Sequence, residues 1–361
     1  MNRVTGVVTR ARVVLVLKIG VSAALLALLL AKAGWTQIGS TLAHAHVGWL
    51  ALGLLLGVAA AGLQANQWRG LLLALGLERS FARCLRLDTE ARVFDAALPS
   101  AIGGDVVRVT LVATAPAERA AAATAVLLRR VFGLPGLALL MAVSLAASAG
   151  LPYAGRIRPV AAVAVLGFAG LLAVLAGAGR FARSVPLPLP AKVRGMAATV
   201  GAARAQARDR DGAERRPFVR ATLRGLAFWT TVVLSQWCFM AAVGIDVPPQ
   251  YAALVVTTVN ALSLLPISLG GYGLREGAFS AFLAVGGLAT TGQGAAVGVI
   301  LSAQTLLFGV VGGLVRLFPT TVSDPAVPAV PDPAVPAPVV TAPVVTAAGA
   351  PTPVPSSSGS S

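Results

Sequence analysis

The chain has 361 residues, of which 57% are hydrophobic and 12% are charged, and its mean hydropathy is +0.82. These values exclude an ordinary soluble globular protein and a disordered chain. The formal net charge of +16 is compatible with nucleic-acid binding. However, 11 of the 29 Lys and Arg lie between residues 180 and 224. That segment has few aromatic residues, so it is better explained as a basic cytoplasmic loop than as a nucleic-acid site.

Long apolar runs predict α-helices that cross a membrane, each of which needs about 20 apolar residues. Counting basic loops by the positive-inside rule gives about eight crossings with both termini in the cytoplasm. The expected fold is therefore an all-α, polytopic membrane helix bundle over residues 13–318, after a basic N-terminus at residues 1–12. Its Pro-, Ala-, Val- and Ser-rich tail, residues 319–361, is expected to be disordered. The runs are residues 13–31, 47–63, 159–178, 221–243, 251–265 and 295–315.

The first apolar run allows two interpretations. Ala31-Lys32-Ala33 has the small-x-small form of a signal-peptidase site after a basic start. The run is long for a cleavable signal and contains Lys18, which favours an uncleaved first helix.

Two tryptophans, Trp49 and Trp68, bracket the second apolar run. Their separation spans roughly 28 Å as helix, about one hydrocarbon thickness. We therefore expect both to anchor the chain at the membrane interfaces, with packing in the protein core as the alternative.

Few residues are suited to catalysis or to metal binding. Cys84 and Cys238 support neither a disulfide framework nor a metal site. His44 and His46 lie in a predicted outer loop and are better explained as solvated residues than as metal ligands. No catalytic triad or phosphate-binding glycine loop is recognisable, so we expect no cofactor, no metal and no catalytic residue.

One pattern occurs twice. "LPSAIGGDVVR" at residues 98–108 and "LPISLGGYGLRE" at residues 265–276 align without a gap as Leu-Pro-x-x-[Ile/Leu]-Gly-Gly-x-x-[Val/Leu]-Arg. Proline costs about 3 kcal/mol and glycine about 1 kcal/mol inside a helix, so both segments should interrupt helices. At membrane depth an interruption is tolerated only where protein or a water-filled cavity surrounds it. An ordinary cytoplasmic turn is the alternative. The crossing count places both motifs on the same side, so it does not indicate an inverted repeat.

The two motifs contain the candidate substrate-binding residues. A helix that restarts after Gly-Gly presents N–H donors to an anionic group such as a lipid phosphate. Arg108 and Arg275 are expected to hold phosphate through two hydrogen bonds, and Asp105 and Glu276 to neutralise them in the empty site. The remaining candidates are Gly103, Gly104, Gly270, Gly271 and Gly273, with Pro99 and Pro266 in structural roles.

These motifs resemble the two signature segments of the flippase-like family, also called the lysylphosphatidylglycerol synthase transmembrane region. The resemblance covers roughly residues 13–317, and "NQWRGLLLALGLERSF" at residues 66–81 is similar to the family's amphipathic stretch. After the first motif the family usually has an acidic residue before an arginine, whereas this chain has Arg129-Arg130. Arg130 matches and joins the candidate binding residues.

The resemblance implies an integral membrane protein that moves, or helps to move, an anionic amphiphilic lipid or lipid-linked substrate between leaflets. The soluble domain that attaches lysine in the fused synthases is not expected here, so we do not expect an enzyme. The alternative is a non-transporting membrane partner of a separate glycosyltransferase or lipid-modifying enzyme. The expected location is the bacterial inner membrane, and the expected partners are membrane lipids.

Overall fold

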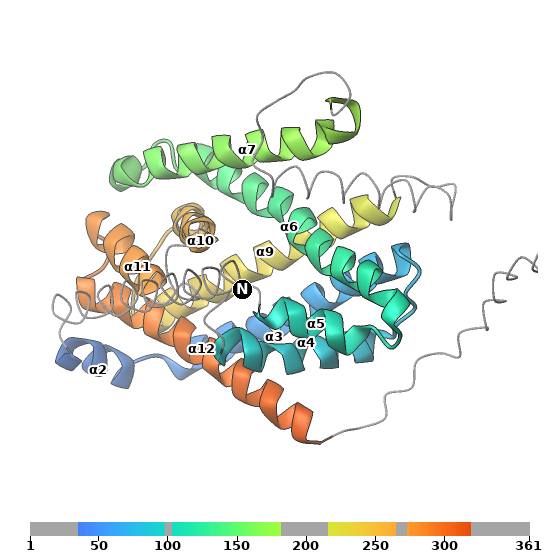
Figure 1. Ribbon diagram of the computed structural model, residues 1–361. Helices are drawn as coiled ribbons and strands as arrows, with labels where there is room; N and C mark the ends of the chain where they lie inside the picture. Colours follow the sequence, from blue (N-terminus) through green and yellow to red (C-terminus); the bar gives the residue numbers. More distant parts are fainter. Residues whose placement is uncertain (1–34, 98–102, 182–215, 265–272, 319–361) are drawn as a thin grey trace, which may run out of the picture. The chain divides into compact units, whose positions relative to one another are not determined.

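The computed structural model describes residues 35–97, 103–181, 216–264 and 273–318 (Figure 1). Within these ranges the chain forms ten α-helices and two short 3-10 helices, and no strand occurs among them. The predicted all-α fold is confirmed. The basic N-terminus, most of the basic loop and the tail lie outside the described residues, so the predicted domain boundaries stay predictions.

Four described helices are long and apolar enough to cross a membrane: α3 (Val47–Ala74), α6 (Arg119–Ala147), α9 (Arg216–Ala242) and α12 (Thr291–Leu317). Each has 27 to 29 residues. At about 1.5 Å per residue they exceed the roughly 30 Å of a hydrocarbon core. A shorter apolar stretch lies in α7 (Arg158–Phe181).

Helix α6 is a candidate membrane span that is not among the six apolar runs, because Arg129, Arg130 and Pro135 interrupt its apolar pattern. It nevertheless packs tightly against α9. A Cβ atom on Gly136 would lie 2.8 Å from the backbone of Leu226, so the two helices approach at backbone distance. Small residues at such crossings are typical of helix packing in membranes.

Helices α3 and α9 pack side by side and run antiparallel. The Ser235 hydroxyl donates to the carbonyl of Gly53 at 2.7 Å, and the Gln67 amide donates to the carbonyl of Ala221 at 2.8 Å. The aromatic ring of Phe239 fills the space that a side chain on Gly53 would need. These two hydrogen bonds satisfy polar groups for which lipid tails offer no hydrogen-bond partner.

The ends of the long helices meet in two groups. His46 N donates to the Ala242 carbonyl at 2.8 Å, and the Gln293 amide donates to the Val243 carbonyl at 3.3 Å. The starts of α3 and α12 therefore lie beside the end of α9. We call this group the His46 end. It comprises α2 (Trp35–Ala43) and residues 44–47, 148–158, 242–250 and 286–293. The 3-10 helix η2 (Pro152–Arg156) lies within residues 148–158.

The opposite group is the Arg79 end. Arg69 donates to the carbonyl of Arg79 at 3.1 Å, and Arg79 pairs with Glu118 of the 3-10 helix η1 (Pro116–Glu118) at 2.8 Å. This end comprises residues 69–86, 112–119, 216–224 and 316–318. Its described arginines are Arg69, Arg79, Arg83, Arg86, Arg119, Arg216, Arg220, Arg224 and Arg316, whereas the His46 end has Arg156 and Arg158.

The first motif lies in a pair of helices. The first helix starts at the Arg79 end, and the second returns to it. α4 (Phe81–Ala97) precedes it and α5 (Gly103–Val112) begins within it. Arg79, just before α4, donates to the carbonyl of Val112, the last residue of α5, at 3.2 and 3.3 Å. The pair is therefore a helical hairpin rather than two crossings, and the expected interruption at residues 98–102 lies outside the described residues.

The second motif lies in a similar hairpin that returns to the His46 end. α10 (Pro249–Ser263) precedes it and α11 (Leu274–Val285) follows it. The hydroxyl of Tyr251 donates to the carbonyl of Phe282 at 2.8 Å, so the start of α10 lies beside the end of α11. With 15 residues, α10 is about 22 Å long and too short to cross. The expectation that run 251–265 spans the membrane is wrong.

The two hairpins therefore enter from opposite ends of the bundle, and the expectation that both motifs enter from the same side is wrong. That expectation depended on counting run 251–265 as a full crossing, which fails for α10. The count of about eight crossings is not confirmed among the described helices, and run 13–31 lies outside them.

The two expected membrane anchors differ in their surroundings. Trp49 is 44% exposed, but Trp68 is fully buried in a core cluster. The guanidinium of Arg129 lies 5.8 Å from the centre of the Trp68 ring, a cation–π distance. The anchor interpretation is wrong for Trp68, because its end of α3 is covered by other helices.

Candidate functional site

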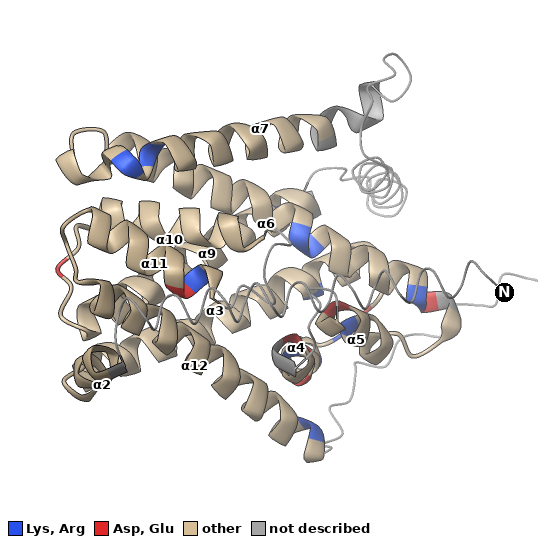
Figure 2. Ribbon diagram, turned by 60° about the vertical axis from the view of Figure 1, so that its left-hand side comes forward, with Lys and Arg blue, Asp and Glu red and all other residues tan. Residues whose placement is uncertain are grey.

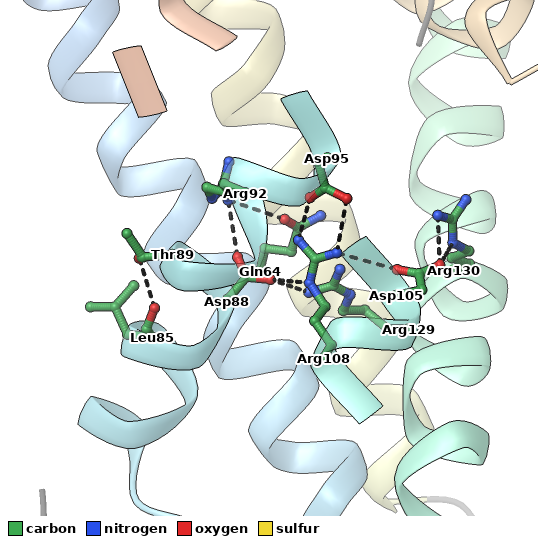
Figure 3. Close-up of polar contacts among 10 residues, drawn as sticks. All are labelled: Gln64, Leu85, Asp88, Thr89, Arg92, Asp95, Asp105, Arg108, Arg129 and Arg130. Carbon is green, nitrogen blue, oxygen red and sulfur yellow. Dashed lines mark hydrogen bonds and ion pairs between the residues drawn. The ribbon is translucent and has the colours of Figure 1, made fainter. Parts of the chain in front are cut away.

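Seven charged side chains form one connected group around the first motif. Figure 2 shows charged residues on α4, α5 and α6, whereas most of the remaining helical ribbon is uncharged. Four arginines face three aspartates, which leaves one net positive charge. We call this group the arginine–aspartate network: Asp88, Arg92 and Asp95 of α4, Asp105 and Arg108 of α5, and Arg129 and Arg130 of α6 (Figure 3).

Helix α4 supplies three members from one face. Asp88, Arg92 and Asp95 are separated by four and three residues, the spacing that aligns side chains along a helix. Arg92 donates through Nη2 to Asp88 at 3.1 Å and to Gln64 of α3 at 3.4 Å. The charged face of α4 is thus turned toward the bundle.

Asp88 is the central acid of the network. Its side chain is 1% exposed, and its Oδ1 atom accepts hydrogen bonds from Arg108 Nε at 2.8 Å and Arg129 Nη1 at 2.7 Å. These contacts join α4, α5 and α6 through one carboxylate. A buried carboxylate is tolerated only when paired and hydrogen-bonded, and here several cations supply those partners.

Arg108, the arginine of the first motif, is enclosed by carboxylates. It donates to Asp95 at 2.6 and 3.3 Å and to Asp105 at 3.3 Å, besides its bond to Asp88, and it is 4% exposed. The expectation that Arg108 itself holds a phosphate is therefore not met in this arrangement, because its donors already face protein oxygens. Asp105 lies beside Arg108 as expected, but it is one of three acids there.

Arg130 is the accessible arginine of the network. Its Nε and Nη2 atoms each lie 2.6 Å from Asp105 Oδ2, and its side chain is 47% exposed. Asp105 thus bridges the buried Arg108 and the exposed Arg130. The departure from the family pattern, Arg129-Arg130 without a preceding acid, is accommodated because each arginine finds an aspartate on another helix.

The start of α5 already has an anion beside it. A Cβ atom on Gly104 would lie 1.8 Å from Asp95 Oδ1, so the Asp95 carboxylate occupies the space above that glycine. Gly103 is the first residue of α5, and Gly104 has an ordinary helical conformation rather than a left-handed one. The close approach of the Asp95 carboxylate explains why residue 104 is a glycine. The group that approaches this glycine therefore belongs to the protein itself.

In the second motif, Glu276 caps the N-terminus of α11. Gly273 has φ +79°, and its N–H donates to Glu276 at 2.7 Å. Glu276 is buried and accepts a hydrogen bond from Ser302 of α12, and Arg275 donates to the same Ser302 hydroxyl at 3.1 Å. A Cβ atom on Gly298 would lie 2.5 Å from the Glu276 Cα atom. Glu276 therefore caps α11 and fastens it to α12.

The structure places the two motifs in separate clusters. Arg108 contacts acids of α4 and α5, whereas Arg275 contacts α12. Pro99, Pro266, Gly270 and Gly271 lie outside the described residues. Among the described residues, no group of three acidic, His or Cys side chains is suited to a metal ion.

Most acids of the network were missed from the sequence. The signal was the stretch "LDTEARVFD" at residues 87–95, in which Asp88, Arg92 and Asp95 share one helical face. A charged stripe is usually a solvated surface, so the stretch was not distinctive without the buried Arg108 opposite it.

Comparison with known proteins agrees with this architecture. One 113-residue stretch is 33% identical to the protein named Glycosyltransferase AglD of Haloferax volcanii, and it covers 30% of this chain. The chain spans 18% of the length of that relative. The family described as "Lysylphosphatidylglycerol synthase TM region" matches residues 15–313, which contain both hairpins and all four long apolar helices except the last residues of α12. The chain is a multi-pass membrane protein of the lysylphosphatidylglycerol synthase transmembrane-region family.

Proposed function

We propose that this protein moves an anionic amphiphilic lipid, or a lipid-linked substrate, between the two leaflets of the bacterial inner membrane, without catalysing a chemical reaction. One observation carries the proposal. A largely buried network of seven charged side chains, with one net positive charge and Arg130 as its exposed arginine, lies beside the long apolar helices. Ionisable groups inside a membrane are costly, and where they occur they commonly mark a substrate pathway.

Arg130 is the group that would meet the lipid first. Its planar guanidinium can hold a phosphate through two hydrogen bonds. When a phosphate binds, the Asp105 carboxylate can shift its interaction toward Arg108, which it already contacts at 3.3 Å. The lipid anion would then replace an internal anion, so the arginine keeps a partner before and after binding.

The arrangement of the hairpins supports the same proposal. Interrupted helices at corresponding places in two halves of a chain are typical of transporters, whose substrate sites lie near the bilayer centre. Here α4–α5 enters from the Arg79 end and α10–α11 from the His46 end, and α12 contacts both through Thr89 and Glu276. The excess of arginines at the Arg79 end supports a cytoplasmic location for that end.

A second candidate function is a non-transporting membrane partner of a separate glycosyltransferase or lipid-modifying enzyme. The observation that favours it is the similarity of 113 residues to a protein named as a glycosyltransferase.

Leaflet exchange in vesicles separates these two functions. Purified protein is reconstituted alone, with fluorescent phosphatidylglycerol in both leaflets, and dithionite reports the fraction that becomes accessible. Translocation predicts faster loss of the inner-leaflet signal than in empty vesicles. Exchange that stays at the level of empty vesicles for every anionic lipid tested contradicts translocation and favours the partner function.

A further inference from the structure

A partly polar, partly open cavity lies between helices beside the arginine–aspartate network. Its volume is about 150 Å³, and residues of α3, α4, α9 and α12 line it. The polar part of the lining consists of Gln64, Arg92, Ser235, Gln236 and Gln304. Arg92 belongs both to this lining and to the network, where it contacts Asp88 (Figure 3).

Two donors of the cavity lining have no hydrogen-bond acceptor. The Nε atom of Arg92 and the Nε2 atom of Gln304 are both buried, and neither is hydrogen-bonded in the described part of the chain. An unsatisfied buried donor is unfavourable, more so when it is charged. A ligand that supplies acceptor oxygens would remove this cost at both atoms.

Charge and size indicate which acceptor fits. Arg92 belongs to a network with one more arginine than aspartates, so an anion is favoured over a neutral hydroxyl. The charged oxygens of a phosphate group accept hydrogen bonds, and those of a phosphodiester are acceptors only, which suits donors contributed by separate helices. An apolar cavity of about 150 Å³ holds benzene, so this one has room for a phosphate with a short organic fragment.

A glycine makes room for one of the donors. A Cβ atom on Gly57 of α3 would lie 2.2 Å from Nε2 of Gln304, closer than any real contact. The atom it would meet is the far end of a flexible side chain, which can turn away without moving the backbone. A methyl group at this position would therefore displace the donor and leave the helices in place.

We propose that this cavity binds a phosphate group through Arg92 and Gln304. If the protein translocates lipid as proposed above, the phosphate belongs to a phospholipid headgroup that passes the network. A small soluble phosphate compound has the same chemistry and is the other source.

The test measures binding to purified full-length protein in detergent, by thermal shift and microscale thermophoresis. The probes are dioctanoyl-phosphatidylglycerol, inorganic phosphate, and dioctanoylglycerol, which lacks phosphate. The variants are Gly57→Ala, Gln304→Leu and Arg92→Gln. The matched control is Gly62→Ala on the same helix, where an added Cβ meets nothing within 4 Å.

We expect phosphatidylglycerol to bind and dioctanoylglycerol not to bind. Losing one hydrogen bond to a charged acceptor should raise the Kd about tenfold or more in Gly57→Ala and Gln304→Leu. Gly62→Ala should bind as the wild type does. If inorganic phosphate binds as well as the lipid and competes with it, the source is a soluble phosphate.

Equal binding of dioctanoylglycerol, or an unchanged Kd in both Gly57→Ala and Gln304→Leu, would overturn the proposal. Arg92→Gln also removes a network contact, so the first two variants decide the result. Binding that depends on Gln304 in a protein that moves no lipid supports the cavity site and contradicts only translocation.

Discussion

Asp88 and Arg108 form an ion pair in the interior, with Oδ1 of Asp88 2.8 Å from Nε of Arg108 and both side chains at most 4% exposed. The same oxygen also accepts from Arg129 at 2.7 Å. One carboxylate thus fixes the returning hairpin α4–α5 to the spanning helix α6. The pair explains how a motif arginine can be both buried and unavailable to a ligand.

Replacing Asp88 with Asn should destabilise the protein strongly. Removing one partner of a buried pair leaves uncompensated charge and costs about 3–5 kcal/mol. Asp95→Asn should cost less, since the Asp95 side chain is 37% exposed and water can partly replace it. Thermal unfolding in detergent measures both variants. Similar melting temperatures for Asp88→Asn and wild type would show that the network does not hold the hairpin.

Replacing Gly298 with Ala should separate α12 from the second motif. The new Cβ would lie 2.5 Å from the Cα atom of Glu276, and a backbone atom cannot turn away. Gly277→Ala, on α11 with nothing within 4 Å, is the control and should be neutral or slightly stabilising. Melting temperatures again provide the measurement. A Gly298→Ala protein as stable as the control would mean that the helices can separate at little cost.

The ion pair at the base of the first hairpin predicts a pH dependence. Burial acts to raise the pKa of the Glu118 carboxyl, but hydrogen bonds from Thr114 and the contact with Arg79 outweigh it, so this pKa lies below its ordinary value of 4.5. Because the folded-state pKa is the lower one, this contribution is complete above about pH 5 and is lost as the pH falls through the folded value.

Glu118→Gln tests that dependence. The wild type should be more stable than the variant at pH 7, and the difference should shrink as the pH falls below 4.5. Melting curves at pH 7, 5 and 4 measure it. A difference that stays constant over this range would show that the Glu118 charge does not stabilise the hairpin base.

Cysteine labelling tests the orientation of the two ends. Single cysteines at Ala115 and Gly155 are introduced in a background without Cys84 and Cys238. Ala115 lies at the Arg79 end and Gly155 at the His46 end. In intact spheroplasts an impermeant maleimide should label Gly155→Cys, while Ala115→Cys should react only after permeabilisation. The reverse pattern would contradict a cytoplasmic Arg79 end.

The all-α fold and the helix interruptions could be predicted from the sequence alone. Composition and the free-energy cost of Pro and Gly inside a helix are local properties. The partners of the motif arginines could not be predicted in this way. Arg108 pairs with Asp88, which precedes it by 20 residues on another helix, and nothing local marks that contact. Glu276 was expected to balance Arg275, yet its cap on Gly273 depends on a positive φ that only the structure shows.

The direction in which the second hairpin enters the bundle could not be predicted from local sequence patterns either. Helix α10 has 15 residues in all, polar ones among them, and the contact between Tyr251 and Phe282 shows that the chain returns after it. Conversely, α6 is long and apolar enough to cross despite Arg129 and Arg130, whose charges are balanced by acids on α4 and α5.

The most direct test of the account is the rate of phosphatidylglycerol exchange in vesicles that contain Arg130→Gln instead of the wild type. Arg130→Lys keeps the charge without the planar fork, and Arg156→Gln, at an exposed site of the His46 end, is the matched control. We predict that Gln lowers the exchange rate about tenfold, that Lys restores part of it, and that Arg156→Gln has no effect. Exchange by Arg130→Gln at the wild-type rate would contradict an arginine-bound headgroup.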